Sequence, residues 1–234
     1  MATDTTKGFI LMHEEWLHDN INSSAANGVR WLTTTDSGTA FGVNDSAELQ
    51  AQGVTGSAND NYNEIAHRLT WRAQDGMMSM EARVDLTDIT AVGTFIGFSD
   101  NVAENQLPVA LSGTTFTAQA NTALGFVFCT DATNDNWHVT MVDDTNLTTV
   151  PIASLNTGVA PVNNTPQTFK VVVYDQEVCN QTRSEFWIDG ELQLTMASSI
   201  DRDALLTPYI GHVTRSCNTR TMNIHYITTK QTRP

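Results

Sequence analysis

The chain has 234 residues, with 12 Lys or Arg against 26 Asp or Glu, so its formal net charge at pH 7 is −14. Proteins that bind nucleic acids neutralise phosphates with clusters of Lys and Arg, and this charge therefore argues against a nucleic-acid partner. A chain of this length can bury, in one domain, roughly 70% of the surface that it exposes when unfolded, without disulfide or metal cross-links. We expect one β-sandwich domain over residues 9–234, preceded by a flexible polar arm at residues 1–8.

The acidic residues are unevenly distributed. No Lys or Arg occurs between Val84 and Phe169. The acidic residues of this stretch are Asp85, Asp88, Asp100, Glu104, Asp131, Asp135, Asp143 and Asp144. The pattern predicts one acidic surface, which serves solubility through mutual repulsion or, as the alternative, docks a partner.

The first quarter of the chain carries weak signals. Its start lacks both a basic region and an apolar stretch long enough for a signal peptide or a membrane span, so we expect synthesis in a cytoplasm and no membrane partner. A short apolar piece occupies residues 9–12. Isolated apolar residues among Gly, Ser, Asn and Thr predict loops and short edge strands from Trp16 to Gly56. Within this stretch, Ser46–Gln52 could form one or two helical turns with Asp45 or Ser46 as the cap.

Strand patterns are clear in the middle of the chain. Apolar and polar residues alternate from Met77 to Leu86, which predicts a strand with one buried and one solvated face. Thr94–Ser99 and Leu124–Cys129 are apolar on both faces, as expected of central strands covered from two sides. Trp137–Val142 and Phe169–Tyr174 continue the series, and the Asn-, Thr- and Pro-rich stretch between them suits a long crossing connection.

A tight hairpin is predicted at Asp189-Gly190, because this dipeptide accepts positive φ at both central positions of a two-residue turn. Such a turn places Ile188 opposite Glu191. With an unbroken register, the core face holds Trp187, Leu192, Leu194 and Met196, and the mixed face holds Phe186, Ile188, Glu191 and Gln193. Phe186 and Ile188 are then bulky apolar residues beside polar ones. They are our interface candidates, to be covered by a loop or by another subunit.

The cysteines and histidines form no metal-binding pattern. Cys129 lies in an apolar run and is expected to be a buried thiol, whereas Cys179 and Cys217 lie near Asn-rich turns. A disulfide between Cys179 and Cys217 is possible but does not follow from the sequence, and there is no CxxC pair for a zinc site. The six histidines show no ligand spacing, so we predict no metal and no cofactor.

Several segments together resemble a known family. They read FIGFSDN (Phe95–Asn101), FWIDGELQLTM (Phe186–Met196), LTPYIGHVTR (Leu206–Arg215) and MNIHYIT (Met222–Thr228). This combination resembles the concanavalin A-like lectin/glucanase jelly rolls. More narrowly, the ending TMNIHYITTKQTRP is similar to structural proteins of tailed bacteriophage particles, including capsid decoration or cement proteins.

The resemblance and the strand pattern agree on an all-β fold, an antiparallel two-sheet jelly-roll sandwich with long loops and at most short helical turns. The resemblance further implies a virion structural protein, made in a bacterial host, that binds the outside of the shell and stabilises it. Its partner would be the major capsid protein, and its own state a homotrimer. No catalytic residues are implied by that role.

The fold family also includes glycosidases and lectins, and the residues of this chain bear on both functions. Laminarinase-like enzymes carry two Glu on one strand, and here the corresponding strand, MEARVDL, lacks the second. Glu81 and Glu185 could face each other from two strands, but two solvated strand carboxylates are the simpler interpretation.

A lectin site, binding a host-surface glycan, has its best candidate in the loop DATNDNW, with Asp131, Asn134, Asp135, Asn136 and Trp137. Ordinary turn chemistry explains the same loop.

Overall fold

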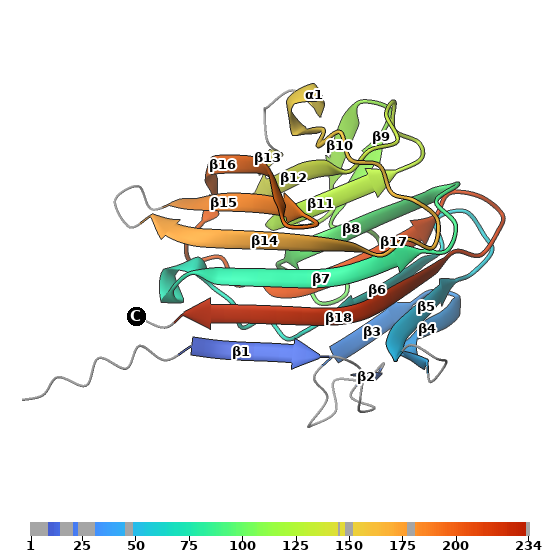
Figure 1. Ribbon diagram of the computed structural model, residues 1–234, viewed down its shortest axis with the longest axis horizontal. Helices are drawn as coiled ribbons and strands as arrows, with labels where there is room; N and C mark the ends of the chain where they lie inside the picture. The colour runs from blue at the N-terminus through green and yellow to red at the C-terminus, as the bar shows by residue number, and fades with distance from the viewer. Residues whose placement is uncertain are drawn as a thin grey trace, which may run out of the picture.

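The computed structural model describes residues 9–14, 21–22, 31–44, 49–144, 146–147, 152–176 and 181–232. These residues form two large β-sheets that face each other (Figure 1). The named strands pair antiparallel, apart from the parallel pair β2 and β3. The predicted all-β antiparallel sandwich is confirmed.

The first sheet, sheet A, has the order β16-β15-β14-β7-β18-β5-β4, and β1 pairs with the C-terminal half of β18. Figure 1 shows these strands in front, from β16 at the top to β1 at the bottom. In chain order they are β1 (Phe9–Glu14), β4 (Gly38–Asn44), β5 (Gln50–Thr55), β7 (Met78–Leu86), β14 (Gln167–Gln176), β15 (Gln181–Ile188), β16 (Glu191–Asp201) and β18 (Thr221–Thr232).

The second sheet, sheet B, has the order β13-β12-β11-β8-β17-β6-β3-β2. Its strands are β2 (Ile21–Asn22), β3 (Trp31–Thr35), β6 (Tyr62–Ala66), β8 (Val92–Ser99), β11 (Ala123–Cys129), β12 (His138–Asp143), β13 (Asn146–Leu147) and β17 (Thr207–Thr214). A separate pair is formed by β9 (Val109–Ser112) and β10 (Thr115–Ala118). The described helical turns are η1 (Ala73–Asp75) and α1 (Ile152–Leu155).

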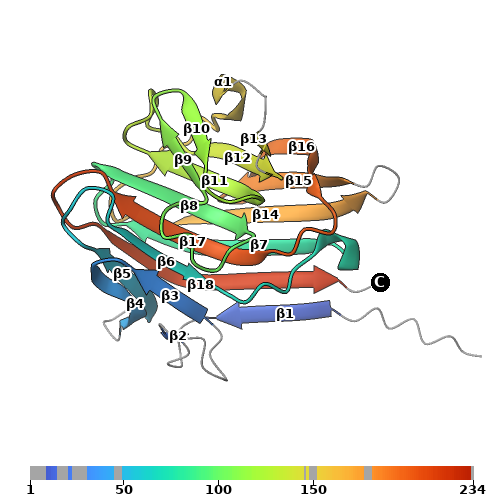
Figure 2. The same cartoon turned by 180° about the vertical axis from the view of Figure 1, so that it is seen from behind.

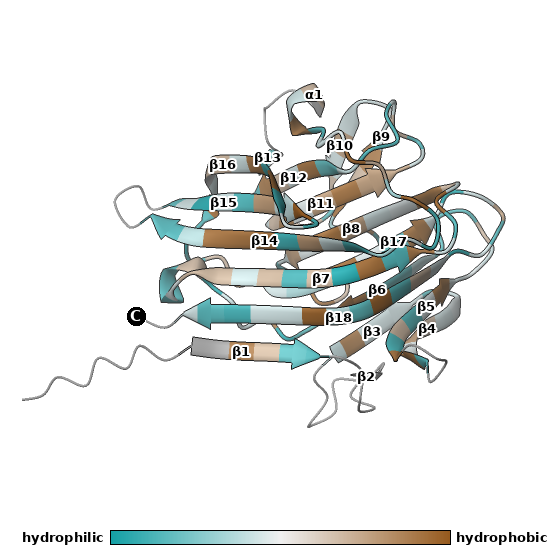
Figure 3. Cartoon of the chain, viewed as in Figure 1, coloured by the Kyte–Doolittle hydropathy of each residue, from teal (hydrophilic) through white to brown (hydrophobic). Residues whose placement is uncertain are grey.

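The main core lies between the sheets. Hydrophilic and hydrophobic residues interleave along β7 and β18 (Figure 3). On β7 the predicted alternation is confirmed from Met78 to Arg83, but Asp85, which was expected on the solvated face, is only 6% exposed. Aromatic rings meet across the gap, with Phe126 of sheet B edge-on to Phe169 of sheet A at 5.3 Å between ring centroids.

The central strands of sheet B are buried on both faces. Every residue of β8 and β11 is buried, as the sequence predicts. The outer cover is the segment 100–122, called the strap below, which includes β9 and β10 and lies beside β11 (Figure 2). Its Leu107, Val109 and Leu111 pack with Phe95 and Tyr209 in a second apolar cluster. The strap therefore covers the outer face of the central strands of sheet B.

The hairpin turn is confirmed, and the predicted core face is right for Leu194 and Met196, but the two faces are exchanged for the residues next to the turn. Asp189 and Gly190 have φ of 51° and 82°, as the turn requires. Phe186 then pairs with Leu194 although Trp187 pairs with Leu192, so Gln193 is an extra residue in β16. Beyond this bulge, the positions of β16 that face the core and those that face outward are exchanged relative to an unbroken register.

The interface candidates consequently lie in the core. Phe186 is 0% exposed and Ile188 is 2% exposed. Phe186 packs edge-on against Phe126 at 5.7 Å between ring centroids. The bulky apolar residues of the hairpin that face outward are instead Trp187, which is partly buried, and Leu192, which is 48% exposed.

Three smaller expectations have mixed outcomes. Gln50–Gln52 belong to strand β5, so the C-terminal part of the helical turn expected at Ser46–Gln52 is wrong, and residues 45–48 lie outside the described residues. Cys129 is a buried thiol, as predicted, and Cys217 is exposed. Cys179 and the arm at residues 1–8 lie outside the described residues.

Candidate functional site

The loop predicted to bind glycans does not present an aromatic surface. Trp137 is 1% exposed and packs against Phe169 with 4.5 Å between ring centroids. Its Nε1–H donates a hydrogen bond to Gln167 Oε1 at 3.0 Å. Asn136 is tied by its side-chain amide to Asn156 at 3.1 Å. Trp137 is thus a core residue, and the exposed members of this loop are Asp131, Thr133, Asn134 and Asp135.

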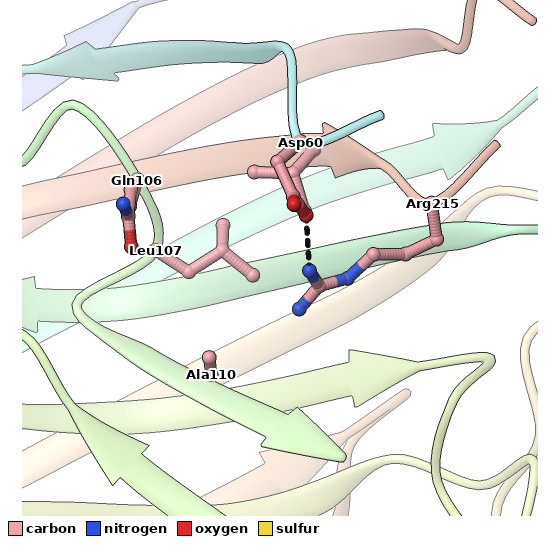
Figure 4. Close-up of a pocket in the computed structure, with 6 residues that line it drawn as sticks. Asp60, Gln106, Leu107, Ala110 and Arg215 are labelled. Carbon is pink, nitrogen blue, oxygen red and sulfur yellow. Dashed lines mark hydrogen bonds and ion pairs between the residues drawn. The ribbon is translucent and has the colours of Figure 1, made fainter. Parts of the chain in front are cut away.

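Asp131 instead reaches the edge of a cavity on the outer side of sheet B. This cavity has a volume of about 150 Å³ and is lined by Asp60, Gln106, Leu107, Ala110, Val213 and Arg215. Figure 4 shows the Arg215 guanidinium directed at Asp60, with which it forms an ion pair. Asp131 Oδ2 lies 3.5 Å from Arg215 Nε. The cavity has a charged rim and an aliphatic floor, and none of its six lining residues is aromatic.

The outer face of sheet A is a more varied surface. The strand registers place one residue from each of five neighbouring strands in a single row across this face, in the order Thr228, Glu81, Lys170, Trp187, Leu192. The row therefore combines a hydroxyl, a carboxylate, an ammonium group, an indole ring and an aliphatic side chain within five strand widths.

A cavity of about 220 Å³ lies in the middle of this row, and we call it the Trp187 cavity. Its lining residues are Glu81, Thr168, Lys170, Trp187 and Gly190. The hairpin turn fixes its rim, because Asp189 Oδ1 accepts the backbone N–H of Thr168 at 2.7 Å. The Trp187 indole N–H is buried and has no hydrogen-bond partner among the described residues.

The polar residues around the Trp187 cavity are held in place. Glu81 accepts the hydroxyl of Tyr226 at 3.0 Å and lies 3.6 Å from Lys170 Nζ. Burial raises the pKa of Tyr226, and its bond to the Glu81 carboxylate raises it further, so the phenol stays protonated as a donor. Glu81 is therefore oriented before any ligand arrives.

The two carboxylates considered for catalysis lie on strands that are not neighbours. Glu185 lies on β15 and Glu81 on β7, with β14 between them. Two strand spacings put their backbones roughly 10 Å or more apart. Glu185 is also bound elsewhere, by Arg183 at 2.6 Å and Tyr174 at 3.1 Å.

In the part of the chain that the structure describes, no three His, Cys, Asp or Glu side chains are grouped so that they could hold a metal ion. Nor does any described helix have the length and apolar character needed to cross a membrane.

Comparisons with known proteins identify the fold. No family model and no curated protein matches the sequence. Among solved structures, the Emp47p carbohydrate recognition domain is similar with a TM-score of 0.57 and 12% identity, over 98% of this chain and 99% of that one. A Bacillus licheniformis β-glucanase has a TM-score of 0.57 and 11% identity, over 96% of this chain and 98% of that one. The fold is that of the concanavalin A-like lectins and glucanases.

A third structure, the Shewanella oneidensis MR-1 protein SO2946 of unknown function, has a TM-score of 0.59 and 10% identity over 100% of this chain and 90% of that one. The neighbours thus include a sugar-binding domain, an enzyme and an uncharacterised protein. None of the three is named as a bacteriophage protein. At these identities the likeness concerns the fold alone.

Trp187 is the candidate residue that the register argument misplaced. A signal for it exists in β15 itself, where Arg183, Glu185 and Trp187 follow each other at every second position. Two charged residues mark the outward face of a strand, and the third member of the series shares that face. The alternation within one strand was a better guide here than a register carried across the turn.

Proposed function

We propose that this protein is a non-enzymatic carbohydrate-binding β-sandwich and that the Trp187 cavity is its binding site. The observation that carries the proposal is the position of Trp187, an outward-facing indole ring beside the oriented carboxylate of Glu81 and the ammonium group of Lys170. Sugars offer apolar C–H faces and hydroxyl groups, which such a combination of ring and polar groups can bind. A cavity of about 220 Å³ suits a single sugar ring rather than a long chain segment.

Two observations support binding without cleavage. Glu81 and Glu185 lie on strands separated by β14, and each is already bonded to neighbouring side chains. The strap also packs on the outer face of the central strands of sheet B, which reduces the surface that this sheet offers to a polysaccharide.

A glycan array followed by titration of the best binders tests the proposal. Trp187→Ala is expected to weaken binding by about tenfold or more, since a buried aromatic contact typically contributes over 1.4 kcal/mol. Leu205→Ala is the matched control, because Leu205 is also an exposed apolar residue, at 43%, but lies away from the cavity. Equal binding by wild type and Trp187→Ala would rule out this site.

A product assay separates binding from catalysis. Wild-type protein incubated with its ligand should release no reducing ends over a day. Release that Glu81→Gln or Glu185→Gln abolishes would contradict the non-enzymatic proposal and assign those carboxylates to cleavage.

Capsid decoration is the second candidate, and the exposure of Leu192 favours it. Leu192 is 48% exposed next to Trp187, and such an apolar pair on a sheet face suits a protein partner as well as a sugar. In this proposal the partner is the major capsid protein, the protein acts as a homotrimer, and it resides on the virion surface. The C-terminal sequence resemblance is its other support.

Co-sedimentation with undecorated bacteriophage shells tests the second candidate. Leu192→Asp should abolish sedimentation with the shell, because a carboxylate would be buried in the contact, while sugar binding in the neighbouring cavity should change little. If the wild type stays in the supernatant at low and high salt, capsid decoration is wrong.

A further inference from the structure

A buried carboxyl group anchors the strap to sheet B. Glu64 lies on β6, faces the strap and is 1% exposed. Its two carboxyl oxygens accept backbone N–H groups of the strap, from Glu104 at 3.1 Å and from Asn105 at 3.2 Å. Glu64 also lies within hydrogen-bond distance of the Tyr209 hydroxyl on β17. One side chain thus connects two strands of the sheet to the segment that covers them.

The hydroxyl of Tyr209 has more acceptors than protons. It lies against Glu64 Oε2 and also 2.9 Å from the backbone carbonyl oxygen of Gln106 in the strap. A phenol donates one hydrogen bond, so both acceptors cannot receive it. If Glu64 is ionised, Tyr209 donates to the carboxylate and the Gln106 carbonyl loses its donor.

A proton on Glu64 resolves this conflict. A protonated carboxyl can donate to the Tyr209 oxygen, which leaves the phenol proton for Gln106. The carboxyl oxygens still accept the N–H groups of Glu104 and Asn105. The neutral form therefore adds a relay from Glu64 through Tyr209 to Gln106, and every polar atom in it has a partner.

Among the described residues, the titratable groups that act on Glu64 and its neighbours are acidic. Those that act on this cluster are Glu104 and Asp100 in the strap, Tyr62 on β6, Tyr209 on β17 and Asp36 after β3. Burial raises the pKa of Glu64 to about 7 even though the hydrogen bonds from Tyr209, Asn105 and Glu104 lower it, and the charge of Glu104 adds a smaller rise. Burial also raises the pKa of Glu104, whose carboxylate accepts the Ser99 hydroxyl.

We propose that Glu64, Tyr209 and Gln106 form a proton-operated latch that holds the strap against sheet B when Glu64 is protonated and loosens when it ionises. Gln106 of the latch and the next residue in the chain, Leu107, line the cavity beside Arg215 (Figure 4). The shape of that cavity is therefore set by the same proton. Loosening would also uncover the apolar residues that Leu107 and Val109 contact on sheet B.

The sign of the effect follows from linkage. The pKa of Glu64 is about 7 when the strap is closed and 4.5 when the carboxyl is in water, so the closed form holds the proton more tightly. Its extra stability is complete below about pH 4.5 and is lost as the pH rises through 7. Between pH 6 and pH 8.5 the equilibrium constant for opening should rise about tenfold.

Hydrogen exchange measured by mass spectrometry tests the latch in the intact protein. Peptides covering residues 100–107 should lose about tenfold in protection between pH 6 and pH 8.5, after correction for intrinsic exchange, while peptides from β12 should change little. In Glu64→Gln, which is neutral at both pH values, the strap should show no such change. The same pH dependence in both proteins, or none in the wild type, would overturn the proposal.

Two further measurements keep the test decisive if Glu64→Gln folds poorly. A ¹³C NMR titration of the Glu64 carboxyl in the wild type should have its midpoint near pH 7, and a midpoint near pH 4.5 would overturn the latch. Tyr209→Phe keeps the ring that packs against Phe95 but removes the relay. At pH 6 this variant should lower the protection of the strap against hydrogen exchange to the level that the wild type has at pH 8.5. Unchanged protection would contradict the role of the hydroxyl.

Discussion

The pKa values of single residues in this protein are shifted mainly by burial. His212 on β17 is 0% exposed, and burial lowers its pKa to about 4. Its ring lies edge-on to Phe41 at 5.5 Å between centroids, and Nε2 is 3.2 Å from the carbonyl oxygen of Arg220. His212 is therefore neutral at pH 7. The opposite shift at Glu64 comes from the same cause, because burial disfavours whichever form is charged.

His212 should weaken the fold in acid. Its folded pKa lies below the ordinary 6.5, so the stability it supports is present above pH 6.5 and is lost as the pH falls toward 4. The free energy of unfolding of the wild type, relative to His212→Gln, should fall by about 3 kcal/mol between pH 7 and pH 4. Urea denaturation at both pH values measures this. A difference that stays constant with pH would show that His212 does not titrate in this range.

Among the elements, the β15–β16 hairpin shows how far sequence patterns extend. The turn was predictable, because Asp189-Gly190 has a local conformational reason to be there. The faces beyond it were not, because the bulge at Gln193 leaves no mark in the alternating ELQLTM of β16. Trp137 was misplaced for a different reason, since its contacts with Phe169 and Gln167 come from a strand 30 residues later.

The corrected register makes a prediction about stability. Phe186→Ala should lower the free energy of unfolding by about 3–5 kcal/mol, because it leaves a cavity in the core between the sheets. Leu192→Ala, on the solvent side of the same hairpin, should change it by less than about 0.5 kcal/mol. Chemical denaturation of the two variants checks that Phe186→Ala loses more stability than Leu192→Ala. Comparable losses, or a larger loss for Leu192→Ala, would mean that the bulge is misassigned.

Across the whole molecule, the uneven charge of the sequence is partly balanced in space. The stretch without Lys or Arg receives cations from the loop after β17, where Arg215 lies beside Asp131 and Arg220 lies 3.5 Å from Asp88. The two-sheet architecture was predictable from alternation and apolar runs. The cover that the strap places over sheet B was not, because the short alternating segments at residues 109–118 do not reveal which surface they bury.

The expectation of one domain over residues 9–234 makes a prediction at this scale. Both sheets share one core, so the protein should unfold in a single cooperative transition. Scanning calorimetry should give a calorimetric enthalpy equal to the van't Hoff enthalpy. Two resolved transitions would divide the chain into independent units.

The central claim, that carbohydrate binds at Trp187, is tested most directly by the indole N–H signals in a ¹H–¹⁵N NMR spectrum. The chain has five tryptophans, and the signal of Trp187 is identified by its absence in Trp187→Phe. Adding the best glycan from the array should shift the Trp187 signal in a saturable way and leave that of the buried Trp137 in place. A glycan that binds with the Trp187 signal unmoved would contradict the assignment of this cavity.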